Sequence, residues 1–199
     1  GAPALQAQSN PSGVGLQLSA LTRAAYQSVK TSTTLSEIDY FLGAFMDAYG
    51  VPAYRTCPQH NIGECRSIAP SDLSPYRDTI AEFILEWSKY TPEFIQISGI
   101  EGVYFLMDLP YGGATFSNDN NFYINSAFGN QDSYPGYIQR VFHHEFFHLV
   151  DKKFPASSDD DWSALNTPGF TYIGGAGYDE LPEKTDHPEL GFVHSYSMV

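Results

Sequence analysis

Three residues near position 145 have the types and spacing of a metal-dependent hydrolytic site. His144, Glu145 and His148 lie in the run HEFFH, which matches the pattern H-E-x-x-H. On a helix, residues i and i+4 share one face, so both imidazoles can bind one Zn²⁺ from the same side. Glu145 lies beside the metal and can accept a proton from the attacking water. The sequence therefore predicts two metal ligands, His144 and His148, and a general base, Glu145.

The segment around this motif is predicted to be one helix over residues 135–151. Pro135 and Gly136 mark its start, and Pro155 bounds its end. A broad apolar arc on this helix should pack in the core; it is formed by Phe142, Phe146, Leu149 and Val150, with Ile138 and Phe147 at its margins. Because a helix this apolar is largely buried, the histidines on its other face need polar partners, and one metal ion would serve both.

Two neighbours of the motif are candidates for supporting roles. His143 points away from the line that joins His144 and His148, and we expect it at the surface or at the rim of the site. Asp151 follows His148 by one turn, where it can orient a ligand. A solvated aspartate at the helix end explains Asp151 equally well.

Composition limits the class of protein and its partners. A chain of 199 residues fits a single domain, 1–199, in which 1–13 is expected to be a loose tail and 1–10 resembles a terminus left after processing. The net charge of −13 argues against nucleic acid and anionic membrane surfaces as partners. No apolar run approaches the roughly 20 residues that cross a bilayer, so no membrane insertion is expected. We expect a monomer.

Cys57 and Cys65 lie eight positions apart in a polar segment. Such a pair indicates a small disulfide and an oxidising compartment, so we expect a secreted, extracellular protein. The alternative is a metal site made of Cys57, His60 and Cys65.

The expected fold is α+β, with N-terminal helices and a small mixed sheet packed on the HExxH helix, followed by an irregular C-terminal part. Ser36 is expected to cap the second helix, and Gly50 to end it. The predicted helices cover residues 16–30, 36–49 and 71–90, and the predicted strands cover 94–98, 102–109 and 121–125. Residues 121–127 are either an open edge that pairs with an extended peptide or an ordinary strand of the sheet.

Several further segments carry a family resemblance. With the HHEFFH run, these are residues 49–52 (YGVP), 162–166 (WSALN), 169–177 (GFTYIGGAG) and 191–198 (GFVHSYSM). Over about residues 49–199 the chain resembles a family of secreted zinc-binding metallopeptidases. These are gluzincins, similar in broad layout to the Pro-Pro endopeptidases and to the catalytic domain of lethal factor. The resemblance implies a zincin-like fold, Zn²⁺ as cofactor and a peptide or protein substrate.

The resemblance also implies a third zinc ligand that the chain does not contain. In the family, a glutamate on an acidic helix follows the G-F-V-x-x-Y motif, whereas this chain stops at Val199. We therefore expect the third ligand after residue 199, because a catalytic zinc normally has three protein ligands. Other residues of the chain are weaker candidates that solvated loops explain as well: Asp179, Glu180, Glu183, His187, Glu189 and His194.

Tyr196 stands where relatives carry a tyrosine that donates a hydrogen bond to the oxyanion. Its alternative is a packed aromatic residue, and Tyr172 is a second choice for the same role. The acidic run 159–161 could bind Ca²⁺, but it lacks the spacing of an EF-hand loop, and a solvated loop fits it better.

Together these features predict a zinc-dependent metalloendopeptidase in which Glu145 activates water and Tyr196 supports the oxyanion. The alternative is a catalytically impaired zinc-binding or adhesion module on the same scaffold.

Overall fold

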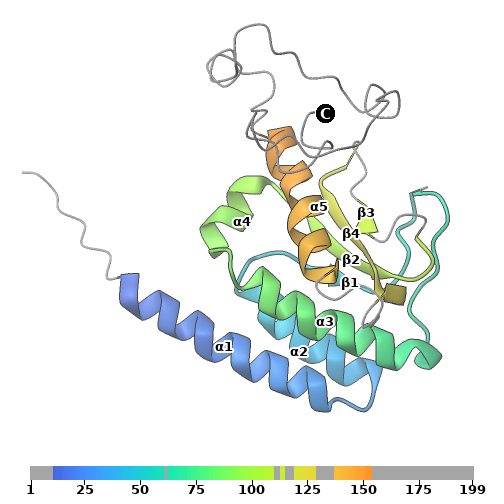
Figure 1. Ribbon diagram of the computed structural model, residues 1–199, viewed down its shortest axis with the longest axis horizontal. Coiled ribbons are helices and arrows are strands. Elements are labelled where there is room, and N and C mark those ends of the chain that lie inside the picture. The colour runs from blue at the N-terminus through green and yellow to red at the C-terminus, as the bar shows by residue number, and fades with distance from the viewer. Residues whose placement is uncertain (1–10, 61, 110–112, 115–118, 129–136, 154–199) are drawn as a thin grey trace, which may run out of the picture. The chain divides into compact units, whose positions relative to one another are not determined.

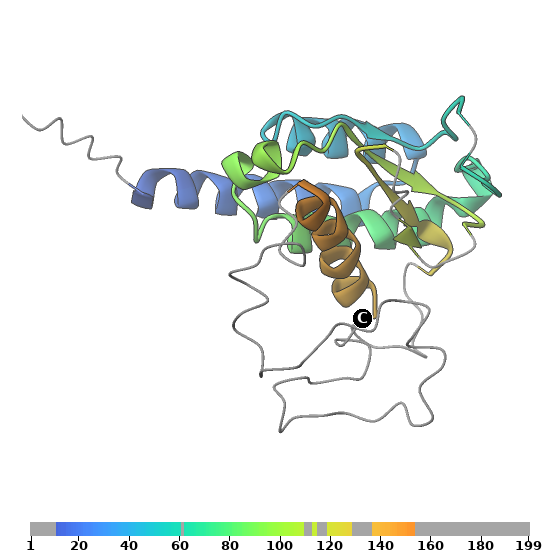
Figure 2. The same ribbon diagram turned by 90° about the horizontal axis from the view of Figure 1, so that it is seen from above.

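The computed structural model describes residues 11–60, 62–109, 113–114, 119–128 and 137–153, and every structural statement below concerns these residues. They form five α-helices, two short 3-10 helices and one four-stranded sheet (Figures 1 and 2). The fold is thus a mixture of helices and a small sheet, as predicted. No helix within these ranges is long and apolar enough to cross a membrane. The predicted single domain over 1–199 stays a prediction.

Three N-terminal helices pack against one another: α1 (Pro11–Thr31), α2 (Leu35–Asp47) and α3 (Leu73–Trp87). Figure 1 shows them side by side on one side of the sheet. Helix α1 begins at Pro11, inside the segment expected to be loose. Helix α2 is capped by Thr34 instead of Ser36, because Thr34 and Glu37 form a reciprocal capping box. The predicted helix over 71–90 is a 3-10 turn, Pro70–Asp72, followed by α3.

The sheet has the strand order β1-β2-β4-β3. Strands β1 (Ala53–Tyr54), β2 (Gly102–Leu106) and β4 (Asn121–Asn125) run parallel, and β3 (Gly113–Ala114) is antiparallel to β4. The period-2 alternation of β2 and β4 places their apolar side chains toward the main core. These side chains are Val103, Phe105, Phe122 and Ile124. The predicted strands over 102–109 and 121–125 are confirmed, the first ending at Leu106.

The strand predicted over 94–98 is wrong, because this segment is the helix α4 (Pro92–Ser98). Thr91 caps the helix by accepting a hydrogen bond from the Phe94 amide, and Pro92 occupies its first turn. Gly99 ends it with φ of 74°, a left-handed conformation that favours glycine. These cap signals outweigh the alternation of apolar and polar residues on which the strand prediction was based.

The interpretation of residues 121–127 as an open edge is also wrong. Strand β4 lies inside the sheet, hydrogen-bonded to β2 on one side and to β3 on the other. Among the described strands, β1 and β3 are therefore the edges. Ser126–Phe128 forms a 3-10 turn rather than a continuation of the strand.

A disulfide joins Cys57 and Cys65, as predicted. It lies on the face of the sheet opposite the helices, where a second small core forms from Ile62, Leu106, Leu109 and Tyr123. His60 is bonded there to Asp119 and to Tyr123, each at 3.0 Å. The alternative metal site made of the two cysteines and His60 is therefore not formed.

Candidate metal centre on helix α5

Helix α5 (Tyr137–Lys153) carries the HEFFH motif and agrees closely with the helix predicted over 135–151. Its apolar arc is buried as expected, through Phe142, Phe146 and Leu149. Phe142 packs edge-on against Phe83, with ring centroids 5.6 Å apart, and Phe146 packs against Trp87 at 5.1 Å. These contacts fix α5 against α3 and leave the motif histidines on another side of the helix.

The rings of His144 and His148 meet on the exposed side of α5. Their centroids are 4.7 Å apart, the ring planes are nearly perpendicular, and the two Nε2 atoms approach to 3.1 Å. A helix alone brings i and i+4 side chains only to neighbouring positions. The convergence of one nitrogen from each ring is thus a particular choice of rotamers, in which one Nε2 donates to the other.

This arrangement fits a zinc ion. Two nitrogen ligands at about 2.0–2.1 Å from a tetrahedral zinc are separated by roughly 3.3 Å. The observed separation of 3.1 Å is close to that value. Imidazole nitrogens are also ligands that zinc prefers. His144 and His148 are therefore the residues that would hold the metal from the described part of the chain.

Glu145 belongs to the same site. Its side chain is 18% exposed, and its Oε1 atom lies 4.0 Å from Nε2 of His144. That distance places the carboxylate beside the His144 ring, and the role of general base stays a prediction.

His143, expected at the surface or at the rim of the site, is partly exposed and lines the pocket beside His144. Its Nε2 atom lies 2.6 Å from Oε2 of Glu86, and its Nδ1 atom lies 2.6 Å from the hydroxyl of Tyr90. Because a carboxylate only accepts, Nε2 donates to Glu86, and a neutral ring then accepts from Tyr90. Both ring nitrogens are thereby used for contacts with α3 and the turn that follows it.

Glu86 is a nearly buried carboxylate, 7% exposed. Burial raises its pKa, but hydrogen bonds from Lys89 and His143 outweigh the burial and hold the pKa below its usual range. Burial and then the charge of Glu86 raise the pKa of Tyr90. A hydroxyl–imidazole–carboxylate chain can activate a nucleophile. Here, however, the raised pKa of Tyr90 opposes formation of a phenolate, so the chain is better suited to holding α3 and α5 together.

An apolar pocket of about 390 Å³ adjoins the histidine pair. His144 forms part of its wall, and Phe94, Phe146, Phe147 and Val150 supply most of the remainder. Phe147 is 61% exposed and Phe94 40%, so large apolar surfaces stand open beside the candidate metal ligands. The volume is at the lower end of ligand-binding pockets.

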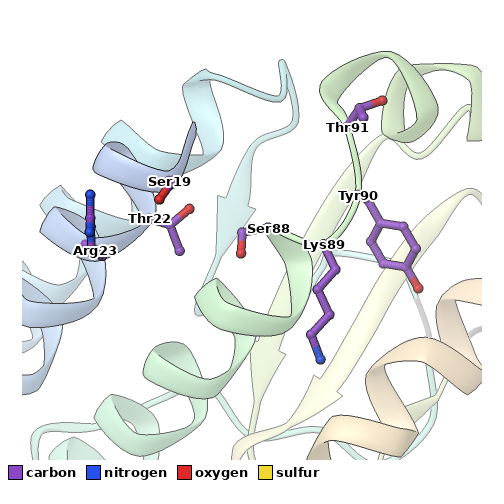
Figure 3. A pocket seen from close by; sticks show the side chains of 7 residues that line it. All are labelled: Ser19, Thr22, Arg23, Ser88, Lys89, Tyr90 and Thr91. Atoms are coloured by element: carbon purple, nitrogen blue, oxygen red, sulfur yellow. The ribbon is translucent and has the colours of Figure 1, made fainter. Parts of the chain in front are cut away.

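A second pocket of about 360 Å³ lies between α1 and the turn that joins α3 to α4. Figure 3 shows Ser19, Thr22 and Arg23 on α1 and Ser88 on the opposite side. Its cations are Arg23 and Lys89, but the ammonium group of Lys89 pairs with Glu86. This pairing leaves little free positive charge for an anion, and the pocket is a weaker candidate than the α5 site.

The remaining predicted site residues lie outside the described residues. They are Tyr172 and Tyr196, the run 159–161, and the ligand candidates Asp179, Glu180, Glu183, His187, Glu189 and His194. Asp151 lies on α5, but its side chain is also outside the described set. Within the described ranges, no group of three or more His, Cys, Asp or Glu side chains is placed to hold a metal ion. The third ligand therefore stays a prediction.

Sequence reasoning missed Glu86 and Tyr90. The position of Glu86 between Ile84, Leu85 and Trp87 is the sequence signal that could have singled out a buried acid. It could not have identified the partner, because His143 is 57 residues away.

Comparisons with models of protein families, with curated proteins and with solved structures found no match to this chain. The resemblance to secreted zinc metallopeptidases accordingly rests on the residues quoted above and stays a prediction.

Proposed function

We propose that the chain is a zinc-dependent metalloendopeptidase. The observation that carries the proposal is the approach of Nε2 of His144 to Nε2 of His148 at 3.1 Å, with the Glu145 carboxylate alongside. When bound, Zn²⁺ supplies a Lewis acid that lowers the pKa of water toward about 7 and polarises the scissile carbonyl.

Glu145 is the proton carrier of the proposed reaction. Its carboxylate accepts a proton from the attacking water and later delivers that proton to the leaving amine. The group is 18% exposed, so it is shielded in part from solvent while remaining open to a substrate. By resemblance, Tyr196 donates a hydrogen bond to the oxyanion.

The apolar pocket beside His144 supports a peptide as the substrate. A residue whose carbonyl lies between the histidines is within side-chain reach of the pocket, because His144 borders both. Phe94, Phe147 and Val150 would stabilise an apolar side chain there by removing it from water. The disulfide supports an oxidising compartment, and we propose secretion on that basis.

The test combines metal analysis with proteolysis. The full chain is depleted of metal with a chelator, reloaded with Zn²⁺, and incubated with an unstructured protein whose fragments are identified by mass spectrometry. Glu145→Gln is the matched control, because it should keep the metal while turnover falls by about 10²- to 10⁴-fold.

Each outcome separates the proposal from its alternatives. One zinc per chain with cleavage that Glu145→Gln removes supports the enzyme. Zinc without cleavage supports a zinc-binding module, the second candidate. Failure to bind zinc refutes both, and cleavage that survives in Glu145→Gln refutes the mechanism.

A further inference from the structure

The direction in which His144 and His148 point depends on how α5 is rotated about its axis. Both residues lie on the exposed side of the helix, and the side chain of His144 is 45% exposed. Side chains reach about 5–6 Å from a helix axis, so a roll of about 20° would move a ring by about 2 Å. Displacements of that size are enough to disrupt a catalytic arrangement.

Two hydrogen bonds between α5 and α3, here called rungs, oppose such a rotation of α5. Gln139 donates to Glu82 at 3.0 Å, and one turn later His143 donates to Glu86 at 2.6 Å. The partners are four residues apart on both helices, so the rungs repeat with the helical period. Hydrogen bonds weaken steeply when their angle changes, so both contacts resist a rotation of α5.

The rung at His143 is the more constrained of the two. Both nitrogens of its ring are hydrogen-bonded, one to Glu86 and the other to Tyr90. Shifting or flipping the ring would therefore disrupt these hydrogen bonds. Figure 3 shows the Tyr90 ring and the Lys89 side chain extending from the end of α3 toward α5. Glu86 is buried and must keep charged or hydrogen-bonding partners, which makes this contact costly to break.

His143 is also the residue directly before His144. Fixing its ring against α3 fixes the backbone from which His144 and Glu145 project. We propose that His143, clamped by Glu86 and Tyr90, is a positioning residue that sets the rotation of α5 and thereby the direction in which His144 and His148 face. This inference rests on the proposed metal site, but the clamp and the rotation of α5 that it would set belong to the metal-free protein.

The test compares His143→Ala with Gln139→Ala, which removes the neighbouring rung on the same two helices. Tyr90→Phe is the milder variant, because it releases Nδ1 of His143 and keeps the aromatic ring; it decides the case if His143→Ala does not fold. In metal-free protein, NMR measures the NOE between the rings of Phe146 on α5 and Phe94 on α4, whose centroids are 6.0 Å apart, because this contact depends on the rotation of α5. In metal-loaded protein, titration with Co²⁺ gives the affinity, and the visible spectrum reports the ligand geometry.

We expect His143→Ala to lose the NOE, to bind Co²⁺ about tenfold more weakly and to change the spectrum. Tyr90→Phe should do the same to a smaller degree. Gln139→Ala should lower the melting temperature while keeping all three signals. If the hydrogen bonds of His143 only stabilised the fold, removing them would change stability alone. A folded His143→Ala or Tyr90→Phe variant that keeps the NOE, the Co²⁺ affinity and the spectrum therefore overturns the inference.

Equal losses in Gln139→Ala also overturn it, because the effect would then belong to helix packing in general. If the wild type binds no Co²⁺, the proposed metal site fails, and the NOE alone still decides whether His143 sets the rotation of α5.

Discussion

The two sides of helix α5 differ in what their polar residues are bonded to. On the side facing α3, Gln139 and His143 each bond a glutamate, and both nitrogens of His143 are used. On the other side, His144 and His148 bring their Nε2 atoms together. The exposed fraction does not distinguish the two neighbouring histidines, because the side chains of His143 and His144 are 35% and 45% exposed. Their hydrogen bonds, and not their exposure, distinguish a residue that holds the helix from one that can bind a ligand.

The largest expected effect is on the free energy of unfolding, and it compares two adjacent phenylalanines on different sides of α5. Phe146 is 1% exposed and packs on Trp87, whereas Phe147 is 61% exposed. Phe146→Ala should lower the free energy of unfolding by about 3–5 kcal/mol because it leaves a cavity in the core. Phe147→Ala should change it by less than about 0.5 kcal/mol. Urea denaturation measures both, and equal losses would mean that α5 is not oriented as described.

The next effect concerns the outward histidines. His144→Ala and His148→Ala should each weaken zinc binding by more than the roughly 10- to 100-fold that loss of an outer-shell partner costs. His60→Ala is the control, because His60 is also well exposed but is bonded to Asp119 and Tyr123 on the other face of the sheet. Competition with a zinc indicator gives the three affinities. Unchanged zinc binding in either α5 variant would remove the distinction between the two sides.

A third prediction separates the site from the stability of the scaffold. Replacing Cys57 and Cys65 together by serine opens a loop closed over eight positions, which should cost about 2.5 kcal/mol by the chain-entropy estimate. The disulfide lies on the face of the sheet away from the helices, so the zinc affinity of the folded variant should stay unchanged. A parallel loss of zinc affinity would show that the α5 site depends on the whole scaffold.

The smallest effect is a pH dependence remote from α5. Hydrogen bonds from Arg66 at 2.6 and 3.3 Å outweigh burial and hold the pKa of Asp72 below its usual value. Such a carboxylate stabilises the fold fully above its unfolded pKa of about 3.9, and the contribution is lost as the pH falls toward the lower folded pKa. Asp72→Asn should therefore cost about 1 kcal/mol at pH 7.

The difference in stability between Asp72→Asn and the wild type should shrink as the pH is lowered below about 4. Urea midpoints between pH 3 and pH 7 measure it. A constant difference across this range would contradict the assigned pKa direction. Zinc affinity at pH 7 should be the same in both proteins, in contrast to variants on the outward side of α5.

Local sequence signals identified much of the fold. The period of apolar residues located α5 and both longer strands, because that pattern reflects which face is buried. The same reasoning failed at α4, where Ile95 and Ile97 alternate with Gln96 and Ser98 as in a strand. The capping residues Thr91 and Gly99 decide that segment, and they too were present in the sequence.

Two other features could not be decided from neighbouring residues. Residues 121–127 were left open between an edge and an ordinary strand, and the two residues of β3 that pair with β4 decide for the second. His143 was expected at the surface or at the rim of the site, but its bonds to Glu86 and Tyr90, more than 50 residues away, were not predicted. Strand order and long-range hydrogen bonds depend on which elements meet in space, which neighbouring residues do not encode.

The sequence by itself determined that α5 is a helix and that His144 and His148 lie four residues apart on it, because helical periodicity follows from the chain. Tertiary structure alone decided that His143 turns toward α3 and that His144 and His148 lie on the exposed side of α5. The physical reason is that rotation of a helix about its axis is set by the partners packed against it, here Trp87, Glu82 and Glu86.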